Sequence, residues 1–175
     1  MKSKKIWNFV VENLPWVNSL SAYLLIKEYV IDVRVGSGKS MMPTFGDNEL
    51  LLIDHISPRL FGYQRGDVIL AINPSVSESL MSKRIIHMEN DVFQHNGGLS
   101  GSTSTMPDFD NDEVFNPKKL IKIKNGFVWV QGDNTNESLD SRHLGPISEK
   151  LLIGRVLATI YPSFKIIDHG LPALD

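Results

Sequence analysis

Short apolar runs bounded by turn-forming residues recur along the chain from residue 33 onward. The first three have the length of single β-strands and comprise Glu49–Asp54, Asp67–Ile72 and Lys83–Met88. The segments between them are rich in Gly, Asp, Asn and Pro, which are the residues that turns prefer. Because apolar runs of about four to eight residues between such turns are typical of buried strands, the pattern predicts a mainly β fold with antiparallel strands.

The second half of the chain continues this pattern. In Leu120–Lys124, two isoleucines alternate with two lysines, as they would in a half-exposed strand. The dipeptide Asn125-Gly126 separates this run from the apolar run Phe127–Gln131. Asn-Gly between two strand-like runs favours a two-residue hairpin. The sequence therefore predicts a β-hairpin centred on Asn125-Gly126.

The remaining segments complete a single β-rich domain over residues 33–175. The segment 93–118 contains H-N-G-G-L-S-G-S-T-S-T-M-P-D-F-D-N-D, and its high content of Gly, Ser, Thr and Asp predicts a surface insertion. Further on, we expect a short helical turn over Ser148–Leu152. A last long strand is expected over Ile153–Tyr161, since a proline follows it.

Residues 1–32 differ in character from the rest. The chain starts with the basic and then apolar sequence M-K-S-K-K-I-W-N-F-V, and a second apolar stretch, Leu14–Ile26, contains Trp16 and Tyr23. This stretch is shorter than the roughly 20 residues that span a bilayer. Flanking lysines and interfacial aromatic side chains nevertheless suit a membrane-associated helix. We therefore predict an N-terminal membrane-anchor region; a soluble amphipathic helix packed on its own domain is the alternative.

The overall composition excludes several classes of function. The 175 residues carry a net charge of −2 without a dominant basic patch, so nucleic acid is not an expected partner. The chain contains no cysteine, which excludes disulfides, thiolate metal sites and a cysteine nucleophile. We expect neither a metal ion nor a cofactor.

Ser40 lies in the stretch G-S-G-K-S-M-M-P-T-F, which covers residues 36–45. The glycines permit tight turns, and Pro43 restricts the residue before it to extended backbone. Two large apolar side chains, Met41 and Met42, follow the serine directly, which favours a site on an apolar surface such as a substrate pocket. Taken alone, the stretch is most simply interpreted as an ordinary Gly-Ser turn before a strand.

A serine needs a neighbouring base to become a nucleophile. Four histidines stand in or beside strands, in the polar insertion or in the tail, and none has a spacing that supports a Ser-His-Asp arrangement: His55, His87, His95 and His169. Lys83 opens an apolar strand instead, and apolar surroundings lower the pKa of a lysine. To act as a base near neutral pH, this pKa has to fall from about 10.4 to about 7–8. Lys83 also fits a charge that protects a strand edge from aggregation.

A polar window, G-D-N-T-N-E-S-L-D-S-R, covers residues 132–142. Its Gly-Asp-Asn start predicts a turn, and Ser138 offers a hydroxyl group. Asp140 can pair with Arg142, and either can pair with Arg84. By itself this window is a polar loop held by side-chain hydrogen bonds.

Taken in order, these windows resemble the signal peptidase I family of membrane-bound serine peptidases. The matching pieces are S-M-M-P-T at Ser40, R-G-D-V-I at Arg65–Ile69, K-R-I-I at Lys83–Ile86, G-D-N-x-x-x-S-x-D-S-R at Gly132–Arg142, and the closing G-P-I-S and L-I-G-R-V. Within the family, the stretch F-G-Y-Q-R-G-D-V-I-L-A-I-N-P-S is most similar to the mitochondrial inner membrane members. The resemblance implies a signal-peptidase-type antiparallel β catalytic core with an N-terminal membrane-associated helix.

The resemblance also implies a role for each matched side chain. Ser40 would be the nucleophile, with its backbone N–H binding the oxyanion, and Lys83 would be the general base. Ser138 would hydrogen-bond to the lysine amine and orient it. A supporting ion-pair network would comprise Asp140, Arg142 and Arg84.

Two parts of the sequence depart from the family pattern. Some bacterial members have a serine two residues before the nucleophile, whose hydroxyl helps to bind the oxyanion, and Gly38 stands at that position here. Glycines are usual where this chain has His87 and Asn90. Asn90 tolerates a positive φ and can replace a turn glycine. His87 has no such property, so the strand end is expected to differ there.

The function implied by the resemblance is that of a Ser-Lys endopeptidase that uses no metal or cofactor. It would remove sorting or signal presequences from membrane-tethered precursor proteins delivered to the mitochondrial intermembrane space. Its catalytic domain would face that space from the inner membrane, beside the lipid bilayer and a related second peptidase subunit. The alternatives are a non-catalytic scaffold subunit of such a complex and a soluble self-cleaving Ser-Lys regulator.

Overall fold

The structure is a computed structural model that describes residues 19, 21, 30–76, 79–95 and 119–170. Its strands are β1 (Ile31–Val35), β2 (Leu50–Asp54), β3 (Val68–Ile72), β4 (Leu80–His87), β5 (Val92–His95), β6 (Lys119–Lys122), β7 (Phe127–Gln131), β8 (Ile147–Ser148), β9 (Leu152–Tyr161) and β10 (Lys165–Ile166). Its helical segments are α2 (Ile56–Phe61), α3 (Ser141–Leu144) and two 3₁₀ turns, η2 (Thr135–Glu137) and η3 (Glu149–Leu151).

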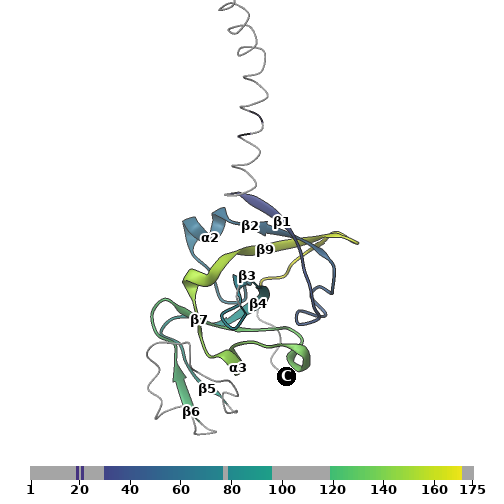
Figure 1. The fold of residues 1–175 in the computed structure, drawn as a ribbon. Helices are drawn as coiled ribbons and strands as arrows, with labels where there is room; N and C mark the ends of the chain where they lie inside the picture. Colours follow the sequence, from purple (N-terminus) through teal and green to yellow (C-terminus); the bar gives the residue numbers. More distant parts are fainter. Residues whose placement is uncertain (1–18, 20, 22–29, 77–78, 96–118, 171–175) are drawn as a thin grey trace, which may run out of the picture.

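One antiparallel sheet dominates this part of the chain (Figure 1). Its strands follow the order β1-β2-β9-β3-β4-β7-β8, and β10 pairs with β9 beside that path. Strands β5 and β6 form a separate two-stranded sheet. The expected mainly β fold is therefore confirmed for the described residues.

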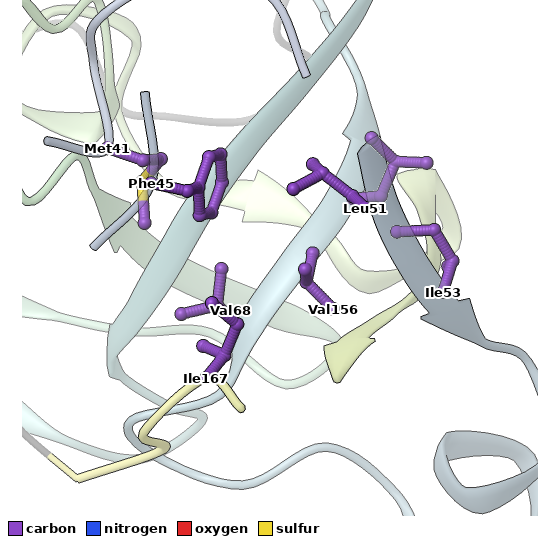
Figure 2. Packing of buried hydrophobic residues seen from close by; sticks show 8 residues of the cluster. Met41, Phe45, Leu51, Ile53, Val68, Val156 and Ile167 are labelled. Carbon is purple, nitrogen blue, oxygen red and sulfur yellow. The ribbon is translucent and has the colours of Figure 1, made fainter. Parts of the chain in front are cut away.

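The central strand β3 is buried on both of its faces. Val68 and Leu70 belong to one core cluster, whereas Ile69 and Ala71 belong to a second. Because successive side chains of a strand point to opposite faces, a strand covered on both sides needs an uninterrupted apolar run. This explains the sequence V-I-L-A-I. Figure 2 shows the first cluster, which includes Met41 from the loop before β2.

The sheet order brings distant segments together. Strand β9 pairs with β2 on one side and with β3 on the other. The loop that carries Ser40 leads from β1 into β2, and Lys83 lies on β4, which pairs with β3. Met41 and Phe45 of this loop pack with Val68 of β3 in the first core cluster. That packing brings the loop across the sheet to Lys83.

Most of the expected strands are confirmed within one residue. These are β2, β3, β7 and β9, and the helical turn expected before β9 is η3. β4 begins at Leu80, three positions before the expected start at Lys83. β9 ends before Pro162 as expected, but it is not the last strand, since β10 follows it.

The hairpin expected at Asn125-Gly126 is wrong. The chain does turn there, with φ +77° at Gly126 and a 3.2 Å hydrogen bond from the Phe127 N–H to the Lys124 carbonyl. The two flanking strands do not pair with each other, however: β6 pairs with β5, and β7 pairs with β4 and β8. The fully buried Ile123, which exchanges backbone hydrogen bonds with the turn after β4, separates the two strands.

Only the first three residues of the insertion expected over 93–118 are described, so the insertion stays a prediction. Its first residues, 93–95, belong to β5, and 96–118 lie outside the described residues. Phe93 is held in the strand because its ring stacks on His87 at a centroid distance of 3.8 Å and meets Trp129 edge-on at 4.9 Å. Asn90 adopts a φ of +67°, which confirms that it serves as a turn residue. As expected, the strand end at His87 is irregular, with a register shift against β7.

The membrane-anchor region expected over residues 1–32 lies mostly outside the described residues. Within the ranges that the structure does describe, no helix has the length and apolar character needed to cross a membrane.

Candidate active site

Ser40 lies in a loop that is closed at its base by backbone hydrogen bonds. Gly36 donates to the carbonyl of Glu49 and accepts from the N–H of Asn48, both at 2.8 Å. Gly38 has a φ of +88°, a left-handed conformation that favours glycine. The backbone conformation therefore explains Gly38, while a Cβ at Gly36 would stand only 3.0 Å from the Leu51 side chain.

The side chain of Lys83 points at this loop. Its Nζ donates a hydrogen bond of 2.7 Å to Ser40 Oγ, and the residue is only 4 % exposed. Burial lowers the pKa of Lys83 below 10.5. The carboxylates of Asp140 and Asp133 act to raise this pKa and the guanidinium of Arg142 acts to lower it, but burial is the largest influence. A lysine with these properties is suited to exchange a proton with the hydroxyl that it contacts.

The two methionines after Ser40 have different surroundings. Met41 is 1 % exposed and packs in the core with Phe45 (Figure 2), which corrects its expected place in a substrate pocket. Met42 is 44 % exposed and is available at the surface. The loop thus uses Met41 as an anchor, because burying a methionine side chain stabilises the fold by about 1.5–3 kcal/mol.

Ser138 is buried but does not hydrogen-bond to Lys83. Its Oγ has no hydrogen-bond partner of normal geometry in the described part of the chain, although its proximity contributes to lowering the pKa of Asp140. Ser138 is packed closely against Gly132: a Cβ added to Gly132 would stand 2.3 Å from Ser138 Oγ and 2.4 Å from the Ser40 carbonyl oxygen. The expected orienting contact is therefore not formed in this structure.

Asp140 and Arg142 form the expected ion pair. Arg142 donates from Nε to Oδ1 at 2.9 Å and from Nη2 to Oδ2 at 2.8 Å, while the Gly132 N–H donates to Oδ2 at 3.0 Å. Complete burial acts to raise the pKa of Asp140, but these hydrogen bonds outweigh it and hold the pKa below 3.8. The charged carboxylate thereby fixes the turn that begins at Gly132.

Arg84 belongs to a second, separate ion pair. It donates from Nε and Nη2 to the two carboxylate oxygens of Asp133, at 2.9 and 2.7 Å, and not to Asp140. Thr44, from the Ser40 loop, donates its hydroxyl hydrogen to the same carboxylate. Asp133 was not among the residues that the sequence pointed to. The Gly-Asp-Asn turn was the available signal, since an aspartate there follows a buried strand and faces the arginine next to Lys83.

Asn134 makes a further contact that the sequence did not reveal. Its backbone N–H donates to the Ser40 carbonyl at 2.9 Å, and its Nδ2 donates to the Lys39 carbonyl at 3.0 Å. These bonds orient the two peptide groups that flank the Ser40 Cα, and the first of them carries the Ser40 N–H. The Ser40 N–H itself makes no hydrogen bond to the described residues, whereas the Gly38 N–H donates to Asp47 at 2.7 Å.

The described histidine side chains have other contacts. His55 Nδ1 lies 3.0 Å from the Ile153 carbonyl, and His87 stacks on Phe93. None of them hydrogen-bonds to Ser40 in the part of the chain that the structure describes. Over the same residues, no group of three or more His, Asp or Glu side chains is arranged to hold a metal ion.

The chain matches a known protein family over most of its length. The sequence profile described as "Signal peptidase, peptidase S26" matches residues 10–161. The chain belongs to the signal peptidase family S26. It is accordingly a hydrolase of the serine peptidase class, as the ordered motifs indicated.

Similar proteins within the S26 family are named as mitochondrial proteases. The chain is 36 % identical over 135 residues to mitochondrial inner membrane protease subunit 1 of Mus musculus, covering 77 % of this chain and 72 % of that protein. It is 30 % identical over 161 residues to subunit 2 of Schizosaccharomyces pombe, covering 88 % and 77 %. The resemblance to the mitochondrial inner membrane members is therefore confirmed.

Among solved structures, a signal peptidase I from Enterococcus faecalis is similar to this chain with 18 % identity and a TM-score of 0.38, covering 53 % of this chain and 95 % of that one.

Proposed function

We propose that the chain is a Ser-Lys endopeptidase in which Ser40 is the nucleophile and Lys83 the general base. The hydrogen bond of 2.7 Å from Lys83 Nζ to Ser40 Oγ carries this proposal. It is supported by the burial of Lys83, which favours the neutral amine that a base requires. It is also supported by membership of the S26 family.

The reaction begins with transfer of the Ser40 hydroxyl proton to neutral Lys83. Oγ attacks the carbonyl carbon of the scissile peptide bond, and the backbone N–H of Ser40 donates to the resulting oxyanion. Protonated Lys83 then gives its proton to the leaving nitrogen, the C–N bond breaks, and an ester between Oγ and the substrate acyl group remains. Lys83 next takes a proton from water, which attacks the ester and releases the acid. The proton returns to Ser40 Oγ.

The oxyanion site of this mechanism consists of backbone donors. Gly38 offers no hydroxyl, and its N–H is already bound to Asp47. The Ser40 N–H is held in position by Asn134, which binds the carbonyls of Lys39 and Ser40 on either side of it. A peptide group fixed in this way costs little reorganisation when the oxyanion forms.

The substrates that we propose are membrane-tethered precursor proteins from which sorting presequences are removed. The site would lie at the mitochondrial inner membrane and face the intermembrane space, and a related second subunit would assemble with the chain. The names of similar proteins, which include both numbered subunits of a mitochondrial inner membrane protease, support this assignment. The exposed side chain of Met42 is the remaining candidate for a substrate contact.

Two substitutions test the proposed chemistry in the full chain purified in detergent. Ser40→Ala should abolish cleavage of a presequence peptide and covalent labelling by a serine-directed acylating inhibitor. Lys83→Met should reduce both by at least about 100-fold, because a general base contributes roughly 10²–10⁴ in rate. Ser75→Ala and Lys122→Met alter exposed residues outside the site and serve as matched controls. An adduct-free wild-type Ser40 would contradict the proposal and favour a non-catalytic scaffold.

The biological substrate needs a separate measurement. In cells that lack the protein, precursor N-termini identified by proteomics should retain their presequences for a set of proteins of the intermembrane space. Complementation with the wild-type chain should restore the mature N-termini, and Ser40→Ala should not. Unchanged N-termini in the deficient cells would contradict the proposed substrate class.

A further inference from the structure

A short segment near the end of the described chain contacts the backbone of the Ser40 loop. We refer to residues 164–170 as the C-terminal strap. Within it, Lys165 Nζ donates a hydrogen bond of 2.9 Å to the carbonyl oxygen of Thr44 and lies 3.5 Å from that of Pro43. Lys165 stands on β10, which pairs with β9 opposite Thr159. A side chain from the strap therefore reaches the backbone four residues after Ser40.

The strap is anchored in the core next to this contact. The Ile167 N–H donates to the Leu157 carbonyl at 2.8 Å, and its side chain is 2 % exposed. Ile167 lies in the same cluster as Met41 and Phe45, the two anchors of the Ser40 loop (Figure 2). Ile167, two residues after Lys165, therefore ties this part of the strap to the core that also holds the Ser40 loop.

Arg84 connects the end of the strap with Asp133. Arg84 Nη1 donates to the carbonyls of Asp168 at 2.7 Å and Gly170 at 3.1 Å, while Nε and Nη2 donate to the carboxylate of Asp133. The residue after Asp133 is Asn134, which binds the Ser40 carbonyl. The strap thus contacts the buried Arg84 through its backbone carbonyls and the Ser40 loop through Lys165.

We propose that Lys165 is a positioning residue for Ser40, which holds the loop by its Thr44 carbonyl so that Oγ stays within reach of Lys83. The inference rests on the proposed role of Ser40 as the nucleophile. A nucleophile displaced by about 1 Å can lose up to 10²-fold in rate, so a tether on its loop acts on catalysis without touching the substrate.

We expect the charge of Lys165 to play no part in this effect. The charged groups that shift the pKa of Lys83 are Asp140, Arg142 and Asp133, and Lys165 is not one of them. Removal of its ammonium group should therefore change how often the loop is in place, and not the pH at which Lys83 becomes neutral. This separates a positioning role from an electrostatic one.

The test compares three variants of the full chain in detergent: Lys165→Met, which keeps the aliphatic stem, Lys165→Arg, which keeps donors and charge, and Lys122→Met as an exposed control on β6. Two readouts are needed. Hydrogen exchange measured by mass spectrometry reports on the amides of Thr44 and Phe45, which donate to the Met41 carbonyl. Steady-state cleavage of a presequence peptide gives kcat and KM over a range of pH.

For Lys165→Met we expect exchange at the loop amides to accelerate and kcat to fall by about three- to tenfold, the range for loss of one hydrogen bond. KM and the midpoint of the pH–kcat profile should stay unchanged. Lys165→Arg should restore both readouts, and Lys122→Met should match the wild type.

Unchanged exchange in Lys165→Met would overturn the inference whether or not the enzyme is active. A rise in KM alone would overturn it in favour of a substrate contact, and a shifted pH midpoint in favour of an electrostatic role. A wild-type chain without acylation at Ser40 would instead refute the proposed function, while hydrogen exchange would still show whether the tether exists.

Discussion

Lys83 Nζ and Ser40 Oγ lie 2.7 Å apart, although the two residues are separated by 43 positions in the sequence. The loop of Ser40 and the strand of Lys83 meet because Met41 and Phe45 are buried against β3, the neighbour of β4. The contact therefore depends on core packing, and substitutions in the core that anchors the loop should alter the reactivity of Ser40.

The rate of Ser40 acylation should rise with pH. Lys83 acts as a base only when neutral, and its pKa lies below 10.5 because it is buried. The rate should therefore increase as the pH rises through this lowered pKa and reach a plateau above it. Inhibitor labelling measured at a series of pH values checks this. A midpoint at or above the ordinary lysine pKa would contradict it.

Gly132→Ala should damage both the stability and the activity of the enzyme. The new methyl group would stand 2.3 Å from Ser138 Oγ, 2.4 Å from the Ser40 carbonyl oxygen and 2.6 Å from Ser138 Cβ, so the Ser40 loop has to move. We expect a loss of about 1–3 kcal/mol in the free energy of unfolding, together with reduced kcat. Urea denaturation and cleavage kinetics measure the two effects.

Gly46→Ala is the matched control for this change. Its new methyl group would lie 3.3 Å from Glu49 Oε1, the end of a long side chain, which needs to shift by only a few tenths of an ångström and can keep its 2.9 Å hydrogen bond from the Gly46 N–H. The expected change in unfolding free energy is within about 0.5 kcal/mol. Equal losses in the two variants would show that the crowding at Gly132 is not the cause.

Arg84→Ala should destabilise the fold far more than Arg65→Ala. The Arg84 side chain is 5 % exposed and its partner Asp133 is 8 % exposed, so the substitution leaves a buried carboxylate without its cation. Such a loss costs about 3–5 kcal/mol. The side chain of Arg65, which pairs with Asp91, is 45 % exposed, and its loss should cost about 1 kcal/mol or less. Similar unfolding midpoints for the two variants in urea would contradict the buried network.

Ile167→Ala should destabilise the chain by about 2–5 kcal/mol, since it creates a cavity in the core beneath the strap. The neighbouring Ile166 is 73 % exposed, and Ile166→Ala should be nearly neutral. Thermal unfolding of the two variants provides the comparison. A larger effect at Ile166 would mean that the register of the strap is different.

Several features of the fold were predictable because they depend on local sequence. Strands β2, β3 and β7 coincide with apolar runs between turn residues, and Asn90 adopts the positive φ that an asparagine tolerates. The order of the motifs around Ser40, Lys83 and residues 132–142 was sufficient to place the chain in its family. Such features can be predicted from the sequence because each depends on residues that are close together along the chain.

The choice among non-local partners could not be predicted in the same way. Asn125-Gly126 forms its turn, but β6 pairs with β5 and β7 pairs with β4, and Ile123, which lies between β6 and β7 along the chain, is fully buried. Arg84 forms its ion pair with Asp133 and not with Asp140, whose carboxylate accepts hydrogen bonds from Arg142 and from the Gly132 N–H. The carboxylates of Asp133 and Asp140 lie in one loop, and the cation that each one binds cannot be assigned until the direction of each side chain is known.

The sequence by itself therefore determined the strands β2, β3, β7 and β9, the family, and the identity of Ser40 and Lys83 as candidates. Only the tertiary structure decided that Met41 is an anchor while Met42 is exposed, that Ser138 does not bind Lys83, and that the strap reaches the loop. The reason is physical: a residue's tendency to form a strand is set by its neighbours along the chain, whereas its burial and its partners are set by segments that meet only when the sheet has formed.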